Sequence, residues 1–445
     1  MTRRYFGTDG IRGTVGQEPL TAEFALRLAS AVARVLAPNG GRAVIGKDTR
    51  VSGYMFESAL EAGFVAAGMD VSLLGPLPTP GIAYLTQSME ADLGVVISAS
   101  HNPFDDNGIK FFDKNGRKLS DEIELQIESY LDEPAITRPS EELGSASRVD
   151  TARSQYQWFC MKTLPPGVDL KGLKIVLDCS HGAAYKVAPR VLSQLGADVV
   201  AIGCSPNGVN INKDCGSTQP ELLQATVKGV GADLGIALDG DGDRLLMVDH
   251  EGNLADGDQL LYVLASARHA DNSLVGPVVG TLMSNLGLEK ALQEKGIEFH
   301  RAKVGDRYVL EMLREKGGQL GGETSGHMLV LDKTTTGDGL VSALQVLSVV
   351  RQSGRPLSEL IAEMPQYPQT LVNVRMENRI DLDASEPIQA AVQQVEAQLG
   401  DRGRVVLRPS GTEPVVRVMV EGQEHQEVVD LAEQLADAVR DAAAA

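Results

Sequence analysis

Several residue types that would indicate a particular class of protein are scarce in this sequence. Its 445 residues contain four cysteines, one tryptophan and nine residues each of tyrosine and phenylalanine. The cysteines, Cys160, Cys179, Cys204 and Cys215, lack the spacing of a zinc or redox motif, so we expect buried thiols in a reducing compartment. Trp158 lies on a predicted helix face, where we expect it to pack in the core.

Long apolar runs and an excess of positive charge are also missing. No stretch of about 18 apolar residues and no secretory leader is present, so we expect a cytoplasmic protein without a membrane partner. Acidic side chains outnumber basic ones by 60 to 41, which gives a formal charge of −19 at pH 7. This charge argues against nucleic acid as a partner. A phosphorylated ligand would need cationic residues gathered in one cleft.

What the sequence does contain is a repeated pattern of strand, helix and strand. In each copy a glycine follows the helix, and the three copies occupy residues 43–75, 174–203 and 277–305. Such a repeat predicts three α/β domains, and the 43% of apolar residues suffices for several cores. Residues 368–445 lack the repeat and predict a compact α+β unit with a strand over 371–376, a helix over 387–399 and a last helix from 426.

Polar or proline-rich breaks separate these units. The stretch from Glu133 to Arg148 is poor in large apolar side chains, and further breaks lie near Gly252 and Pro365. We therefore predict an α/β protein of three repeated mixed α/β domains and a C-terminal α+β domain. The predicted domains are residues 1–150, 151–252, 253–367 and 368–445.

A serine follows an apolar strand in a sharp polar turn. Residues 93–97 predict a short buried strand, and the turn formers of 98–103 end it. Ser100 would then lie at the carboxyl end of a strand, where a nucleophile is exposed. A plain loop, in which Ser and Asn side chains satisfy backbone groups, is the alternative.

Three aspartates alternate with glycines between two apolar strands. Asp239, Asp241 and Asp243 would raise one another's pKa unless a cation neutralises them, and the glycines let their oxygens converge. Oxygen ligands select a hard cation such as Mg²⁺. An EF-hand loop is excluded, because Arg244 and His250 stand where it needs Gly and Glu.

A third motif lies in a loop between predicted strands at 405–407 and 415–420. Its guanidinium, hydroxyl and glycine groups suit a phosphate dianion, and they belong to Arg408, Ser410, Gly411, Thr412 and Arg417. A hairpin turn with incidental charges is the alternative.

With these motifs, the chain resembles the α-D-phosphohexomutase family over its whole length, and within it the branch that acts on glucosamine phosphate. The resemblance rests on segments 5–13, 46–50, 97–112, 239–244, 322–327 and 408–414. It implies a phosphoserine at Ser100 that also serves as a metal ligand, Mg²⁺ on the three aspartates, and mixed sheets around a central cleft. The substrate-binding residues that it implies are Arg244, Asp306, Arg307, Glu323, Ser325, Arg408, Ser410, Gly411, Thr412 and Arg417.

The activity implied is the interconversion of glucosamine 6-phosphate and glucosamine 1-phosphate for UDP-N-acetylglucosamine and peptidoglycan precursors. Glucosamine 1,6-bisphosphate would be the intermediate and activator. The first phosphate would come from an activating kinase or from autophosphorylation, and the oligomeric state stays open. The alternatives are a glucose or mannose phosphate mutase, a phosphatase, or a sugar-phosphate binding protein without activity.

Proton transfer leaves several assignments open. Arg12 and Lys110 are candidates in the catalytic set, and Lys110 is either the general base or a counter-ion for phosphate. His101 is either a base or a hydrogen-bonding support of its loop. Asp306 either attracts the ammonium group of an amino sugar or pairs with Arg307.

Overall fold

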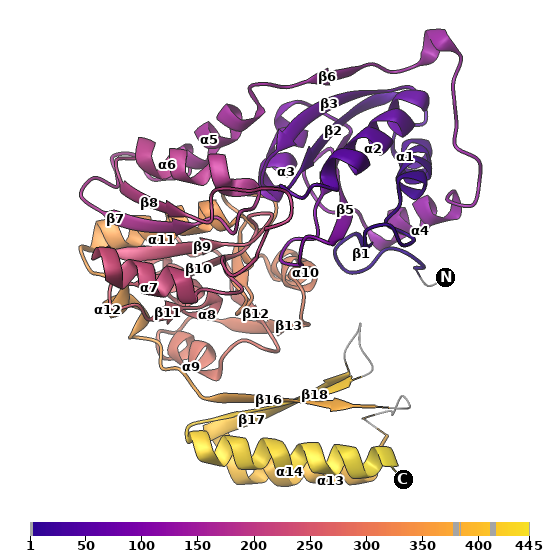
Figure 1. Cartoon of the computed structure of the whole chain (residues 1–445). Helices are drawn as coiled ribbons and strands as arrows, with labels where there is room; N and C mark the ends of the chain where they lie inside the picture. The colour runs from indigo at the N-terminus through magenta and orange to yellow at the C-terminus, as the bar shows by residue number, and fades with distance from the viewer. Residues whose placement is uncertain (1–2, 377–381, 383, 410–414, 445) are drawn as a thin grey trace.

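The computed structural model describes residues 3–376, 382, 384–409 and 415–444 of the chain. Figure 1 shows a body of three α/β units with a smaller unit, residues 369–444, beneath it. The proposed Ser410, Gly411 and Thr412 lie outside the described residues. None of the helices in the described part of the chain is long and apolar enough to cross a membrane.

The first unit is built on a six-stranded mixed sheet in the order β1-β5-β4-β2-β3-β6. Its strands are β1 (Ile11–Thr14), β2 (Gly41–Lys47), β3 (Met69–Pro76), β4 (Leu93–Ile97), β5 (Asp106–Asp113) and β6 (Ala146–Arg148). Its helices are α1 (Ala22–Leu36), α2 (Gly53–Ala66), α3 (Thr79–Ser88) and α4 (Asp121–Ser129), with a short 3-10 turn at Ser140–Glu142. Strand β4 is buried along its whole length, as its unbroken apolar sequence predicts.

The second unit has a five-stranded sheet in the order β11-β10-β9-β7-β8. Its strands are β7 (Lys174–Asp178), β8 (Asp198–Ile202), β9 (Leu234–Leu238), β10 (Leu245–Asp249) and β11 (Leu254–Ala255). Its helices are α5 (Ala152–Lys162), α6 (Ala188–Gln194) and α7 (Glu221–Val230), with a 3-10 turn at Ala183–Lys186. The acidic loop joins the antiparallel pair β9 and β10.

The third unit has a four-stranded sheet in the order β13-β12-β14-β15. Its strands are β12 (Val278–Thr281), β13 (Phe299–Ala302), β14 (Leu320–Gly322) and β15 (Met328–Val330). Its helices are α8 (Gly257–Ala270), α9 (Leu286–Glu294), α10 (Asp306–Lys316), α11 (Gly339–Ser353) and α12 (Leu357–Ile361).

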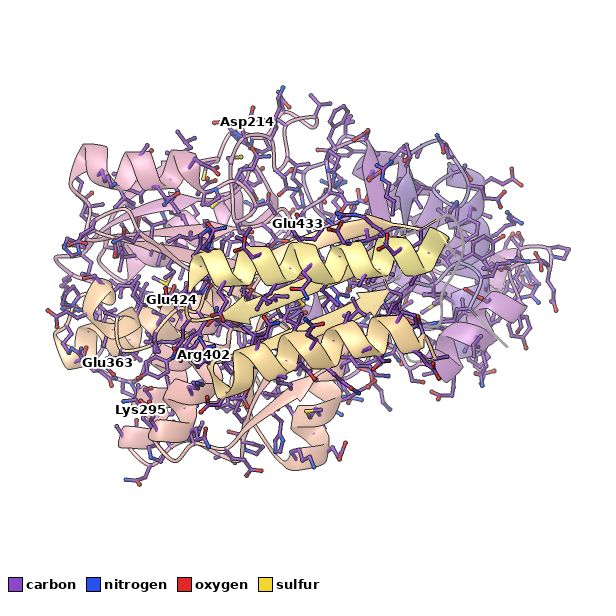
Figure 2. All side chains as sticks on the ribbon, turned by 90° about the horizontal axis from the view of Figure 1, so that it is seen from below. Asp214, Lys295, Glu363, Arg402, Glu424 and Glu433 are labelled. Atoms are coloured by element: carbon purple, nitrogen blue, oxygen red, sulfur yellow. The ribbon has the colours of Figure 1, made fainter. Side chains whose placement is uncertain are left out.

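The C-terminal unit is an antiparallel sheet with helices on one face. Among the described residues its strands pair in the order β16-β18-β17. They are β16 (Gln369–Arg375), β17 (Gly403–Pro409) and β18 (Val415–Gly422), and the helices are α13 (Glu386–Leu399) and α14 (His425–Ala444), with a 3-10 turn at Gly400–Arg402. In Figure 2, α13 and α14 cover the outer face of this sheet.

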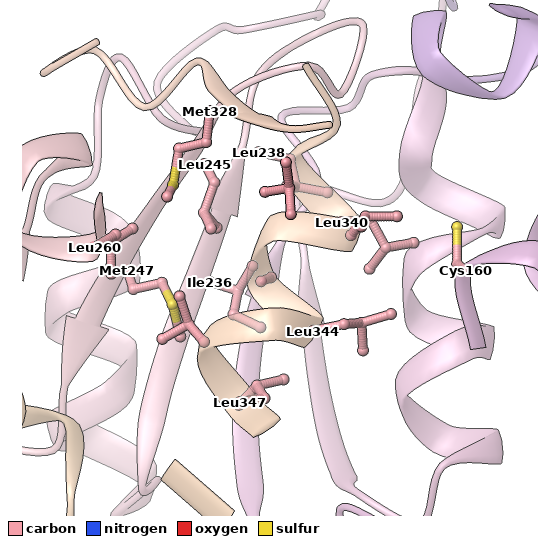
Figure 3. Close-up of a cluster of buried hydrophobic side chains, with 14 of the residues drawn as sticks. Cys160, Ile236, Leu238, Leu245, Met247, Leu260, Met328, Leu340, Leu344 and Leu347 are labelled. Atoms are coloured by element: carbon pink, nitrogen blue, oxygen red, sulfur yellow. The ribbon is translucent and has the colours of Figure 1, made fainter. Parts of the chain in front are cut away.

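The first three units share a continuous core. Helix α11 of the third unit lies between β9 and β10 of the second unit and Cys160 of α5, with Leu340 and Leu344 on the side that faces Cys160 (Figure 3). The core also includes Tyr156 and Phe112. Burial of apolar surface from three units in one cluster gives the body a single framework for the loops at the strand ends.

The predicted fold class, three mixed α/β units and a C-terminal α+β unit, is confirmed by these sheets. The prediction for Trp158 is wrong, because its side chain is 58% exposed and lies beneath the Lys162 ammonium. The four cysteines are free thiols, and Cys204 is only partly buried.

Candidate active site

Ser100 has a backbone conformation that turns its hydroxyl toward the acidic loop. Its φ is 52°, in the left-handed region that non-glycine residues rarely adopt. The side chain is buried, and Oγ donates a 2.6 Å hydrogen bond to Asp239 Oδ2. The hydroxyl therefore points across the boundary between the first and second units.

Two buried side chains hold this turn in place. Arg50 is fully buried and donates from its guanidinium to the carbonyls of Ser100 at 3.0 Å and Asn102 at 2.9 Å. Asn212 of the second unit donates to the same two carbonyls, at 2.8 and 3.0 Å. Asp48 fixes Arg50 through a 2.8 Å bond from Nε. These bonds from two units offset the cost of the left-handed backbone at Ser100.

The three aspartates converge as their spacing predicts. Asp239, Asp241 and Asp243 are buried, and one carboxylate oxygen from each lies within 4.8 Å of the others. Asp239 Oδ1 accepts three backbone N–H groups, those of residues 242–244, at 3.1 Å each. A Cβ on Gly240 would lie 2.4 Å from the Ser100 carbonyl oxygen, so only glycine permits this close approach.

The cluster has the properties of a site for a divalent cation. Burial, followed by the charges of Asp243 and Asp241, raises the pKa of Asp239 well above its ordinary value. Asp241 Oδ1 and Asp243 Oδ1 are buried without a hydrogen-bond partner among the described residues. Hard carboxylate oxygens that lack donors suit a hard cation, so the residues present fit the expected metal.

A chain of alternating charges leads from one side of the acidic loop to the other. Lys110 Nζ lies 2.9 Å from Asp241 and 2.9 Å from Asp9, and Lys118 Nζ lies 2.6 Å from Asp9 and 2.5 Å from Asp306.

His327 completes this chain, which therefore spans all three units of the body. Its Nε2 lies 3.3 Å from Asp306 and its Nδ1 lies 3.6 Å from Asp243. Burial lowers the pKa of His327, but Asp243 and Asp306 outweigh burial and raise that pKa to about 9.

The two proton-transfer candidates differ in charge. Burial opposes the charged form of Lys110, but Asp241 and Asp9 outweigh it and raise the pKa of this amine. His101 Nδ1 lies 3.4 Å from Ser100 Oγ, and burial together with the charges of Arg244 and Arg12 lowers its pKa to about 4. At neutral pH His101 is thus uncharged and Lys110 is an ammonium.

Of the two readings left open for Asp306, the one that pairs it with Arg307 is wrong. Asp306 contacts Lys118 and His327, whereas the Arg307 guanidinium contacts Asp121 and lies 3.3 Å from Glu311. The reason is helical geometry: adjacent residues at the start of α10 point in different directions. The Arg307 guanidinium consequently contacts α4 of the first unit and its own helix.

The loop between β14 and β15 contributes Glu323. Its Oε1 accepts the Gly305 N–H at 3.0 Å, and burial raises its pKa. Ser325 in the same loop is exposed and does not line the cavity that Glu323 faces. Arg12 is held by Asp9, whose charge contributes to the raised pKa of the guanidinium despite its burial.

Arg408 and Arg417 lie opposite each other on β17 and β18. Burial and the charge of the neighbouring Arg417 lower the pKa of Arg408. Such a pair suits bidentate binding of a phosphate.

One cavity of about 570 Å³ brings these groups together. Its lining includes Ser100, Asp243 and Arg244 from the body, and Arg408 and Arg417 from the C-terminal unit. The same wall also contains Asp9, Arg12, Lys118, Gly305, Asp306, Glu323 and His327, whereas Arg307 is outside it. The cationic groups expected for a phosphorylated ligand are thus gathered in this cavity, but nearly as many carboxylates line it with them.

Several of these residues had no role in the sequence analysis. Asp9 and Arg50 stand inside quoted segments, but nothing in their spacing indicates the buried contacts that they make. Lys118, His327 and Asn212 lie far from their partners in sequence, so only the packed units bring them together.

These units and this site match a known class of enzyme. Models of the phosphoglucomutase/phosphomannomutase α/β/α domains I, II and III match residues 3–136, 164–252 and 256–367, and the model of the C-terminal domain matches residues 371–438. The chain belongs to the phosphoglucomutase/phosphomannomutase family.

Within this family the chain is similar over its full length to bacterial phosphoglucosamine mutases. It is 58% identical over 447 residues to the phosphoglucosamine mutase of Thioalkalivibrio sulfidiphilus, covering 100% of this chain and 99% of that protein. It is also 58% identical over 441 residues to the phosphoglucosamine mutase of Methylococcus capsulatus, covering 99% of each.

Two solved structures extend the comparison. A phosphoglucomutase/phosphomannomutase family protein from Burkholderia thailandensis is 25% identical, with a TM-score of 0.81 and coverage of 98% of this chain and 97% of that one. N-acetylphosphoglucosamine mutase of Aspergillus fumigatus, in complex with GlcNAc-6P and magnesium, is 19% identical, with a TM-score of 0.71 and coverage of 99% and 96%. At that identity the second likeness shows the fold alone.

Proposed function

We propose that the protein is a phosphoglucosamine mutase, an isomerase that interconverts glucosamine 6-phosphate and glucosamine 1-phosphate. The observation that carries this proposal is the pairing of a buried serine hydroxyl, 2.6 Å from a three-carboxylate cluster, with two arginines in the same cavity. A nucleophile at one end and an anion grip at the other are what transfer of a phosphate between two ends of one sugar requires. The full-length identity to bacterial phosphoglucosamine mutases supports the substrate.

In the proposed reaction Ser100 carries a phosphate. The phosphoryl group moves to the free hydroxyl oxygen of the sugar monophosphate: a P–O bond to the sugar forms, the P–O bond to Ser100 Oγ breaks, and the proton of the sugar hydroxyl passes to Ser100 Oγ. The product of this step, glucosamine 1,6-bisphosphate, turns in the cavity and returns its other phosphate to Ser100. Net atoms and charge are unchanged, as an isomerase requires.

The residues divide the work between the two ends of the substrate. Arg408 and Arg417 hold whichever phosphate is idle, because a guanidinium recognises either end equally. Glu323 is placed to accept hydrogen bonds from sugar hydroxyls. Lys110 stays protonated beside the serine loop, which supports its role as a counter-ion for the transferring phosphate instead of a base.

A divalent cation, which we propose to be Mg²⁺, would be held by Asp239, Asp241 and Asp243 with the phosphate on Ser100. When bound it neutralises charge on the transferring phosphoryl oxygens. Exclusion of water by closure of the C-terminal unit over the cavity would protect the phosphoserine from hydrolysis.

The phosphoserine is tested with Ser100→Ala. Intact mass of the purified wild-type protein should include a species heavier by about 80 Da, the mass of one phosphate on a serine, and the variant should lack that species. The variant should also lose nearly all mutase activity, because no other described hydroxyl donates to Asp239. Wild-type turnover in Ser100→Ala would overturn the scheme, and steady release of inorganic phosphate by the wild-type protein would indicate a phosphatase.

A further inference from the structure

A short segment of the third unit, residues 282–286, donates and accepts hydrogen bonds at two neighbouring parts of the structure that each carry residues of the cavity wall. It connects β12 to α9 and lies at the boundary with the C-terminal unit. On one side it contacts the loop between β14 and β15, residues 322–327. On the other side it contacts the sheet that carries Arg408 and Arg417.

Asp258 connects this segment to the loop. Thr324 Oγ1 donates to Asp258 Oδ2 at 2.7 Å, and the Asn285 N–H donates to the same oxygen at 2.8 Å. Asp258 is fully buried near the start of α8. One carboxylate oxygen therefore binds both the loop that holds Glu323 and the first residue before α9.

The loop also packs closely on the helix that carries Asp258. The Gly257 N–H donates to the Thr324 carbonyl at 3.0 Å. A Cβ on Gly257 would lie 2.0 Å from the Glu323 carbonyl oxygen, so the loop rests directly on the backbone of α8. Movement of Thr324 is consequently resisted from two directions.

Glu421 connects the same segment to the C-terminal unit. It is fully buried at the end of β18, and its Oε1 accepts the Leu286 N–H at 2.8 Å. Its Oε2 accepts a 2.6 Å bond from Arg404 Nε. The Arg404 guanidinium also donates to the carbonyls of Leu282 at 2.8 Å and Ser284 at 2.6 Å.

The two strands that bind segment 282–286 through Arg404 and Glu421 also hold the two arginines of the cavity. Arg404 and Glu421 are a cross-strand pair, and Arg408 and Arg417 are another pair four residues along the same strands. Side chains four residues apart in a strand share one face and lie about 13 Å apart along it. The opposite face of β18, with Val416, Val418 and Val420, packs in the core under the helices.

We propose that Asp258 is a positioning residue that couples the sugar-reading loop to the phosphate-binding arginines through segment 282–286. Loss of the Thr324 hydrogen bond to Asp258 shifts segment 282–286 and so weakens its bonds to Arg404 and Glu421. Loss of the Glu421 bonds shifts the same segment and so makes the loop over 322–327 more mobile. The roles given to the loop and to the arginines, sugar binding and phosphate binding, rest on the proposed function. The coupling between them is a property of the folded chain.

The coupling is tested by hydrogen exchange in two reciprocal variants of the full-length protein. Thr324→Val removes the hydroxyl with little change of shape, and backbone exchange over 282–287 and 415–422 should become several-fold faster than in wild type. Glu421→Gln should accelerate exchange over 322–327. Thr324→Ser retains the hydroxyl and is the matched control, with exchange over 415–422 as in wild type.

Kinetics with glucosamine 6-phosphate provide the second readout. Thr324→Val and Asp258→Ala should raise KM several-fold with a smaller fall in kcat, because displaced arginines weaken the grip on the idle phosphate in ground and transition states alike. Asp249→Asn, a buried aspartate that accepts backbone N–H bonds in the second unit, should leave kcat and KM unchanged.

The outcomes separate the two proposals. Faster exchange only within 322–327 in Thr324→Val, and only around 415–422 in Glu421→Gln, would overturn the coupling even if the wild-type protein is an active mutase. A wild-type protein without mutase activity would overturn the proposed function, and the reciprocal exchange experiment would still decide the coupling. If Asp258→Ala does not fold, comparison of Thr324→Val with Thr324→Ser decides the coupling without it.

Discussion

At the scale of single residues, the site contains buried charged side chains, which are tolerated there because each contacts a partner. Ser100, the three aspartates of the acidic loop and Lys110 are nearly inaccessible to solvent. An ionised group in such a position is tolerated only when it is paired or bound to a metal. Substitutions here should therefore affect chemistry more specifically than substitutions on the surface.

Asp241→Asn should raise the Mg²⁺ concentration needed for half-maximal activity steeply and lower kcat even at saturating metal. The change removes one charge from the cluster and one attraction on Lys110, so the metal is held more weakly and charge in the transition state is less well stabilised. Mutase assays across a Mg²⁺ titration measure both quantities. An unchanged Mg²⁺ requirement would remove Asp241 from the ligand set.

Arg50→Lys should lower kcat by about 10- to 100-fold with a small change in KM, because misplacing a reacting group by about 1 Å costs on that order. A lysine cannot span the carbonyls that the planar guanidinium reaches at Ser100 and Asn102. Steady-state kinetics measure the split, and circular dichroism confirms folding. Retained kcat would show that Asn212 alone holds the serine turn.

At the scale of elements, buried helix caps join the units of the body. Asp338 is the N-cap of α11 and accepts the Val341 N–H at 2.9 Å. It also accepts a 2.7 Å bond from the Tyr156 hydroxyl of α5 in the second unit. Burial raises the pKa of Asp338 to about 6, although these donors oppose the shift.

The pH dependence of stability should reflect this cap. Between its ordinary pKa near 4 and about 6, native Asp338 keeps a proton that the unfolded chain has lost, so its contribution to stability falls as pH rises through this range. Asp338→Asn keeps a good N-cap and cannot ionise. Melting temperatures measured from pH 4 to 7 should decline less in the variant, and parallel curves would contradict the assignment.

At the scale of the whole molecule, ion pairs between residues of different units line part of the cavity. Lys118 of the first unit lies between Asp9 of its own unit and Asp306 of the third. Lys118→Met would remove one cation from each of two carboxylates, leaving Asp9 with Lys110 and Arg12 and Asp306 with His327, and should cost up to about 3 kcal/mol. Adding Asp306→Asn should recover part of the lost melting temperature, measured by calorimetry. A double variant as unstable as the sum of both changes would show that the pair is not coupled.

Local patterns in the sequence were enough to predict much of the fold. Strand β4 has the predicted bounds, and the strands around the acidic loop appear where the unbroken apolar runs indicate them. The convergence of Asp239, Asp241 and Asp243 also follows from spacing alone, because alternating glycines let a short loop fold back on itself. Interactions within one segment can be read from that segment.

The rest was decided by the tertiary structure. Trp158 is exposed because the neighbouring units leave that face of α5 uncovered, which helix periodicity does not reveal. Asp306 pairs with Lys118 and His327, and not with its neighbour Arg307, because the first and third units meet at that point. The sequence by itself determined the repeated units, the serine turn and the carboxylate cluster, which are local. Tertiary packing alone decided which distant charges neutralise one another, because buried charges take whatever partner lies within a few ångströms in space.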